Sequence, residues 1–163
     1  MSILTIVTES DAKNPVLRAR SKEVADISDA EIQRLIKDMQ DTLAIAKNGI
    51  GLAASQVGKN LRLFVVSPAL GLNQIIFINP VIAKISEKNK LVDEGCLSVI
   101  GLYGKIKRAE SLKIEAYNQN GRKFKMKAEG LVAQLFQHEV DHLDGILFKD
   151  KANNIWEQES QKS

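Results

Sequence analysis

The sequence contains two histidines, and they lie four residues apart in the segment His138-Glu139-Val140-Asp141-His142. On a helix this spacing puts both imidazoles on one face, where they can bind a single metal ion. Glu139 lies beside them and can accept a proton from a water molecule at the metal. A chance match between surface histidines is the alternative. The rarity of the pattern in this chain favours a metal-binding H-E-x-x-H helix.

A catalytic metal of this kind usually has three protein ligands, so a third ligand is needed. The zinc-protease pattern H-E-x-x-H-x-x-G-x-x-H fails because Phe148 stands where its last histidine should be. Glu157 and Glu159 are candidates, but they lie in a polar segment with no pattern that would hold them. Cys96, the only cysteine, lies in the glycine-containing turn EGCLS (94–98) and offers a strong thiolate ligand. We therefore expect Cys96 to be the third ligand; an inert buried thiol is the alternative.

A third segment, GIGLAASQVG (49–58), is rich in glycine and alanine. Such small residues let the backbone come close to another group. The Gln56 amide within it can both donate and accept strong hydrogen bonds. A tight turn between a helix and a strand is the alternative. The segment lacks the G-K-[ST] ending of a phosphate-binding loop.

Taken in order, GIGLAASQVG, EGCLS and QHEVDHLDG resemble the three signature motifs of the peptide deformylases, and the resemblance spans most of the chain. It implies an α+β fold and one divalent metal ion, with Fe²⁺ expected and Zn²⁺ or Ni²⁺ as substitutes. It also implies removal of the formyl group from the N-terminal formyl-methionine of new polypeptides. Residue by residue, it implies metal ligands at Cys96, His138 and His142, a general base at Glu139, and oxyanion donors at Gln56 and the Leu97 amide.

Two other classes of protein share part of this pattern. A metallopeptidase would use the same H-E-x-x-H but a third ligand further along the chain, so it would keep its metal without Cys96. A non-catalytic, metal-stabilised binding module would have no use for the carboxylate of Glu139.

A deformylase must hold a methionine side chain in an apolar pocket and bind the rest of the peptide through its backbone. The expected pocket and strand edge consist of Ile50, Gly51, Val92, Leu131 and Leu135. Ser55, Ile100 and Gln134 depart from the usual pattern of the family. Because Gln134 adjoins the pocket, we expect its amide to turn away and to form hydrogen bonds elsewhere.

These residues need elements to position them. A helix is predicted from about Asp29 to Lys47, with a capping box formed by Ser28 and Glu31 and an end at Gly49. A last helix is predicted from about Glu129 to His142. The predicted strands are Leu61–Val66, Gln74–Ile78, Val81–Ile85, Leu112–Tyr117 and Arg122–Lys127, the last two joined by an Asn-Gly hairpin turn. The expected fold is α+β, with mostly antiparallel sheets packed around the H-E-x-x-H helix.

The 163 residues, 44% hydrophobic and 26% charged, indicate a single domain over 1–163. One cysteine excludes an intrachain disulfide and favours a reducing compartment. Together with the resemblance to the peptide deformylases, which implies a bacterial-type enzyme, this leads us to expect a cytoplasmic protein. No apolar run is long enough to cross a membrane. A net charge of +3 with 5% aromatic residues argues against sequence-specific nucleic-acid binding.

The expected partners are nascent N-formyl-methionyl peptides. Lys123, Lys125 and Lys127 alternate and therefore share one face of a strand. A solvated face is the simplest interpretation, and weak association with the ribosome is the alternative.

Overall fold

The structure, a computed structural model, describes residues 2–10 and 15–158. These residues form a five-stranded sheet of order β1-β2-β3-β6-β7 and a three-stranded sheet of order β4-β5-β8. The strands are β1 (Gly51–Ala53), β2 (Leu63–Val66), β3 (Ile76–Ile85), β4 (Asn89–Cys96), β5 (Val99–Ala109), β6 (Ser111–Tyr117), β7 (Lys123–Glu129) and β8 (Asn154–Glu157). The helices are α1 (Ala30–Ile45), α2 (Gly130–Leu143) and α3 (Phe148–Lys151), with short 3₁₀ turns η1 (Pro15–Arg18), η2 (Ala54–Val57) and η3 (Pro68–Leu70).

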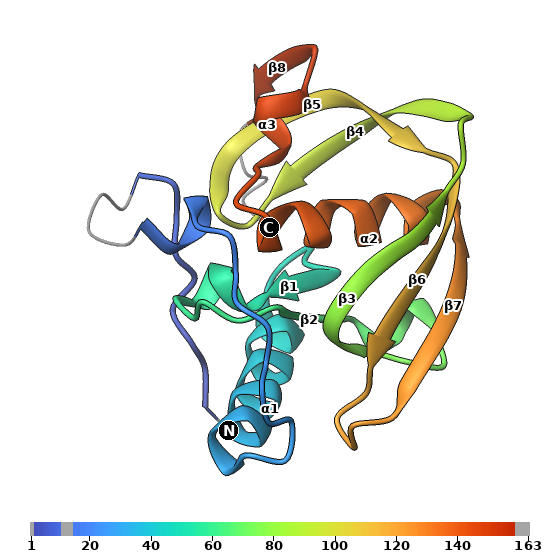
Figure 1. Cartoon of the computed structure of the whole chain (residues 1–163). Coiled ribbons are helices and arrows are strands. Elements are labelled where there is room, and N and C mark those ends of the chain that lie inside the picture. The colour runs from blue at the N-terminus through green and yellow to red at the C-terminus, as the bar shows by residue number, and fades with distance from the viewer. Residues whose placement is uncertain (1, 11–14, 159–163) are drawn as a thin grey trace.

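Helix α2 lies between the two sheets. Figure 1 shows it with β4 and β5 on one side and β1 on the other, and it contacts β1, β5, β6 and β7. Its Phe136 is buried against Phe64 and Phe77, with ring centroids 5.9 and 4.8 Å away. All pairings between the named strands are antiparallel. The expected α+β fold class is therefore confirmed.

The start of α1 differs from the prediction. Asp29, not Ser28, caps the helix, because its carboxylate accepts the N–H of Glu31 at 2.7 Å. Ser28 instead donates its hydroxyl to Asp26 at 2.6 Å. The predicted capping box was wrong because Asp29 lies one residue nearer to the helix and satisfies its free N–H groups first. The helix also ends two residues earlier than expected.

The segments predicted before and after Pro80, Gln74–Ile78 and Val81–Ile85, form one continuous strand, β3, from Ile76 to Ile85. The pairing of β3 with β6 shifts register between Ile78 and Val81, and Asn79 has a positive φ of 51°. A bulge of this kind lets proline remain inside a strand. The Asn79 side chain bonds to both the N–H and the carbonyl of Val24, which holds the bulge in place.

The C-terminal half of the five-stranded sheet agrees with the prediction. Strands β6 and β7 pair along their length around the Asn-Gly turn, where Gly121 has a φ of 78°. Asn118 accepts two backbone N–H groups of the turn, those of Asn120 and Arg122. Helix α2 lies within one residue of the predicted bounds.

Strands β4, β5 and β8 were not predicted. The arms of the β4–β5 hairpin contain glycines and many charged, exposed residues, a composition that is depleted in strands. Pairing stabilises them: β4 pairs with the next strand, β5, as a hairpin, and β5 also pairs with β8, which lies far along the sequence. The polar C-terminal segment thus becomes an edge strand. No helix in the described part of the chain has the length and apolar character needed to span a membrane.

Candidate metal centre

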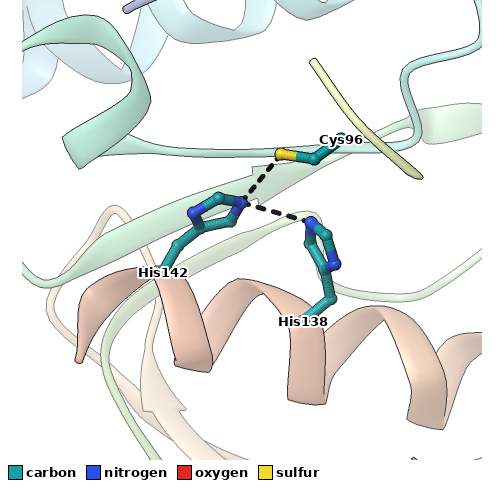
Figure 2. A group of neighbouring side chains, drawn as sticks. All are labelled: Cys96, His138 and His142. Carbon is teal, nitrogen blue, oxygen red and sulfur yellow. Dashed lines mark hydrogen bonds between the residues drawn. The ribbon is translucent and has the colours of Figure 1, made fainter. Parts of the chain in front are cut away.

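The two histidines of α2 meet the cysteine at the end of β4, as Figure 2 shows. His142 Nε2 lies 3.1 Å from Cys96 Sγ and 3.2 Å from His138 Nε2. The three ligand atoms all lie within 4.8 Å of one another. Helical spacing brings the histidines together, and the packing of β4 beside α2 adds a residue more than forty positions earlier in the sequence.

Glu94 orients the first histidine. Its Oε1 accepts the Nδ1–H of His138 at 2.6 Å, which turns His138 Nε2 toward His142 Nε2, 3.2 Å away. The Arg108 guanidinium holds Glu94 through two bonds of 2.7 and 2.8 Å. A third bond, of 2.7 Å, joins Arg108 to Asp141 on α2.

Sequence reasoning missed this buried network of Glu94, Arg108 and Asp141. Two of its members had a signal: Glu94 lies two residues before Cys96, and Asp141 lies inside the H-E-x-x-H segment. Arg108 had none, because its strand was not predicted. Arg108 bonds to both oxygens of Glu94 and to one of Asp141, whose other oxygen accepts a bond from Lys151 at 3.1 Å. These charged partners offset the cost of burying the carboxylates.

Neighbouring charges set the protonation states of the site residues. Burial opposes ionisation of the Cys96 thiol, but the neighbouring His142 and His138 outweigh it and hold the pKa of the thiol well below its usual value. Burial also opposes the charge on Glu94, yet its bonds to Arg108 and His138 lower the pKa of this carboxyl to about 2. Cys96 is therefore a thiolate and Glu94 a carboxylate. Burial opposes the charge on His138, but Cys96 and Glu94 outweigh it and raise the pKa of this imidazole well above its usual value, so a metal ion would displace a proton from the ring.

The donor set fits a divalent metal ion. Two nitrogen ligands of one tetrahedral ion lie about 3.3 Å apart, close to the 3.2 Å between the Nε2 atoms of His138 and His142. The hydrogen bond to Glu94 keeps a proton on His138 Nδ1, so Nε2 is the ring atom that would give up its proton and coordinate a metal ion. One thiolate and two imidazoles leave a fourth position of a tetrahedral ion for water or substrate.

Glu139 lies beside this cluster, with only 2% of its surface exposed. Its Oε2 is buried without a hydrogen-bond partner among the described residues, and burial raises the pKa of the carboxyl to about 7. The edge strand β1 approaches it closely: a Cβ on Gly51 would lie 3.0 Å from Glu139 Oε1 and 2.8 Å from Leu135 Cδ1. A glycine at position 51 is what allows this approach.

Gln56, on η2, lies close to Cys96. Its Oε1 accepts the Ala53 N–H at 2.9 Å, so its NH₂ group points toward the metal-ligand turn. Nε2 donates to Ser98 Oγ at 3.2 Å and lies 3.6 Å from Cys96 Sγ. Leu97 and Ser98 form the turn that joins β4 to β5. Ser98 was not singled out from the sequence, although it belongs to the EGCLS motif.

The remaining expected site residues fall into two groups. Val92 and Leu131 line a surface hollow of about 550 Å³ together with Gln134. The other group, Ile50 and Leu135, belongs to the core beside β1, next to Gly51. As expected, the Gln134 amide forms hydrogen bonds elsewhere, to the Asp93 carbonyl at 3.0 Å and to Glu94 Oε2 at 3.4 Å.

Of the two alternative third ligands, only Glu157 lies in the part of the chain that the structure describes. Glu157 is exposed on β8 and lies outside the cluster of ligand atoms. Glu159 lies outside the described residues. Cys96 is therefore the residue that joins the two histidines.

A set of metal ligands with a buried carboxylate beside it defines a metal-dependent hydrolase. A sequence profile of the family described as polypeptide deformylase matches residues 3–158, and the chain belongs to that family. A peptide deformylase of Symbiobacterium thermophilum is 45% identical over 156 residues, which cover 95% of this chain and 69% of the relative. Peptide deformylase 1 of Bacillus anthracis is 40% identical over 97% of both chains.

Solved structures agree with the sequence relatives. The crystal structure of a peptide deformylase from Thermotoga maritima superposes with a TM-score of 0.85 at 35% identity, covering 94% of this chain and 99% of that one. A peptide deformylase from Synechococcus elongatus in complex with actinonin gives 0.84 at 39% identity, covering 93% and 79%. Enzymes of this family are metal-dependent hydrolases that deformylate the N-terminus of new polypeptides.

Proposed function

We propose that this chain removes the formyl group from the N-terminal formyl-methionine of newly made polypeptides and releases formate. The observation that carries the proposal is the convergence of Cys96 Sγ with the Nε2 atoms of His138 and His142 beside the buried, unpaired carboxylate of Glu139. Residues 1–163 would act as one catalytic domain.

Cys96, His138 and His142 would hold the metal ion. We propose Fe²⁺ as the native ion, with Zn²⁺ or Ni²⁺ as substitutes, since a thiolate and two imidazoles accept several divalent ions. The low pKa of the Cys96 thiol and the proton held on His138 Nδ1 by Glu94 support this ligand set. Metal analysis of protein purified without oxygen would identify the native ion.

A divalent ion at this site would lower the pKa of a water molecule from 15.7 to about 7 and polarise the formyl oxygen. Glu139 would take the proton of the attacking water and deliver it to the departing amine, so that the C–N bond breaks to give formate and a free N-terminus. A pKa of about 7 suits both transfers, because such a group accepts and releases protons near neutral pH.

Negative charge develops on the formyl oxygen during the attack. The Gln56 NH₂ group and the Leu97 N–H would donate hydrogen bonds to it. The position of Gln56 Nε2, 3.6 Å from Cys96 Sγ, supports this role because it places the donor beside the metal-ligand turn.

Two edge strands support binding of an extended peptide. β1 ends the five-stranded sheet and β4 ends the three-stranded sheet of the described residues, so each has one side free to pair with a substrate backbone. Ile50, Val92, Leu131 and Leu135 would surround the methionine side chain, and Gly51 would let the peptide approach Glu139. Leu131 is 56% exposed, which leaves apolar surface for a substrate to cover.

The basic face of β7 supports no more than weak binding to the ribosome. Lys123, Lys125 and Lys127 are exposed on one face, as predicted, but Glu115 lies 3.9 and 3.3 Å from the first two and reduces their net charge. Cosedimentation with ribosomes at low and high salt would measure this. We propose the cytoplasm as the location, where new chains emerge and a thiolate ligand stays reduced.

The deciding experiment is hydrolysis of formyl-Met-Ala-Ser by the metal-loaded protein, with formate measured as the product. We expect turnover that depends on the metal and stops when a chelator removes it. Cleavage of internal peptide bonds without release of formate would instead identify a metallopeptidase. Metal binding without turnover of either substrate would indicate a binding module.

A further inference from the structure

A short N-terminal segment forms backbone hydrogen bonds to two parts of the site, η2 and the β4–β5 turn. The N–H of Val7 donates to the carbonyl of Gln56 at 2.7 Å, and the N–H of Glu9 donates to the carbonyl of Ser98 at 2.9 Å. We call residues 7–9 the N-terminal strap. It joins η2, which carries Gln56, to the β4–β5 turn, which follows Cys96.

The strap is itself held at both ends. Val7 is 7% exposed and belongs to a small apolar cluster with Val16 and Leu17. At the other end, the Glu9 carboxylate forms an ion pair with Lys149 on α3. The strap is thus attached to parts of the chain outside the site, so it can act as a fixed reference for the two turns.

Side chains complete a closed ring of contacts. Gln56 Nε2 donates to Ser98 Oγ at 3.2 Å, and the Ser98 N–H donates to Cys96 Sγ at 3.4 Å. The strap therefore sets the separation of the two backbones, and the Ser98 hydroxyl sets the direction of the Gln56 amide. Both Gln56 and Ser98 are fully buried, so water does not compete for these bonds.

We propose that the N-terminal strap positions Gln56 against the turn of Cys96, so that its NH₂ group meets the developing oxyanion. The inference rests on the proposed role of Gln56 in deformylation. An oxyanion donor works only within about 2.7–3.1 Å of the oxygen, and a misplacement of 1 Å can cost about a hundredfold in rate. Val7 and Glu9 are positioning residues in this scheme, and they act through Gln56.

The test uses the full chain loaded with metal. Val7→Pro removes the N–H that holds Gln56, and Glu9→Pro removes the N–H that holds Ser98. For each we expect kcat on formyl-Met-Ala-Ser to fall about tenfold, with KM within about twofold and with unchanged Zn²⁺ affinity in a chelator competition. Thr5→Pro, at an exposed position outside the strap, is the control and should retain the starting kcat.

A double-mutant cycle with Gln56→Leu distinguishes positioning from general stabilisation. If the strap acts through Gln56, Val7→Pro should cause no further loss of kcat once the amide is absent. Additive losses would overturn the proposal. An undiminished kcat in Gln56→Leu alone would instead overturn the proposed role of Gln56.

A third variant covers the case in which the proline variants do not fold. Ser98→Ala opens the same ring from the side-chain end and leaves the backbone unchanged. Its expected loss of kcat, again about tenfold, should also disappear in the Gln56→Leu background. An unchanged kcat in Ser98→Ala, with Tm and Zn²⁺ affinity intact, would contradict the ring as a positioning device.

Discussion

The two halves of the metal centre are built in different ways. One half lies on α2, where His138, Glu139 and His142 occupy a single helix face within five residues. The other half consists of two turns that carry Gln56 and Cys96, forty residues apart in sequence. The helical half depends on local periodicity, whereas the other half depends on a fold that places η2 and β4 beside the same helix. Changes in the sheets would therefore leave the α2 residues in place relative to one another but would misplace Gln56 and Cys96.

Charged hydrogen bonds connect the two halves. Glu94 on β4 bonds to His138 on α2, and Arg108 on β5 bonds to Asp141 on α2. Arg108 joins these two bonds, because it also bonds to Glu94. Gln134 and Gln137 of α2 add uncharged hydrogen bonds to the same hairpin. Side chains can be replaced in each half and in the hydrogen bonds between them, which we call the link, to measure what each contributes.

Loss of the thiolate should have the largest effect. We expect Cys96→Ala to lower metal affinity by more than about a hundredfold, the upper range for losing a residue that only supports a ligand, and to lower turnover with it. Chelator competition and formate release would measure the two effects. Glu157→Ala is the control and should keep both. If Cys96→Ala kept its metal and Glu157→Ala lost it, the third ligand would lie downstream, as in a metallopeptidase.

Loss of the carboxylate on the helical half should separate catalysis from metal binding. Glu139→Gln keeps the size of the side chain but cannot accept a proton, so we expect kcat to fall about 10²–10⁴-fold. Metal content should stay unchanged, because Glu139 is not among the three clustered ligand residues. Metal analysis and steady-state kinetics on the same sample would show this. Full activity in Glu139→Gln would remove the general-base assignment.

The difference between the halves also explains what could be predicted from sequence. The spacing of His138 and His142 and the Asn-Gly hairpin are local signals, and both were confirmed. The β4–β5 hairpin was missed because its charged, glycine-containing arms are held by pairing across the sheet. Arg108 was missed for the same reason, because its role depends on where that hairpin lies. Strand was predicted on both sides of Pro80, but the bulge that accommodates the proline could not be predicted, because Val24, far away in sequence, stabilises it.

Breaking the link should reduce stability more than it reduces turnover. Arg108→Met would leave Glu94 with His138 as its remaining partner and Asp141 with the half-exposed Lys151, and we expect the free energy of unfolding to fall by about 3–5 kcal/mol. Lys105→Met is the matched control, since its ion pair with Asp93 on the same hairpin is exposed; it should cost under about 1 kcal/mol. Urea unfolding at saturating Zn²⁺ would compare them. Equal losses would show that the buried network does not join the hairpin to α2.

The smallest effect should come from Gln134, which lies where the link meets the proposed methionine pocket. Its amide bonds to the Asp93 carbonyl and lies 3.4 Å from Glu94 Oε2, so only its methylene groups are left to contact a substrate. Gln134→Leu would remove these bonds to β4, but Arg108 and His138 would still hold Glu94. We therefore expect kcat/KM for formyl-Met-Ala-Ser to change by less than about tenfold, or about 1.4 kcal/mol.

A comparison of substrates sharpens this last test. If the Gln134 amide stays turned toward β4, Gln134→Leu should change kcat/KM for formyl-Met-Ala-Ser and formyl-norleucine-Ala-Ser by the same factor, because neither side chain meets the amide. A change well above tenfold that is confined to the methionine substrate would mean that the amide contacts the thioether directly. A large change shared by both substrates, together with weaker Zn²⁺ binding, would mean that Gln134 is needed to hold Glu94 against His138. Gln134 would then belong to the link between the two halves and not to the pocket.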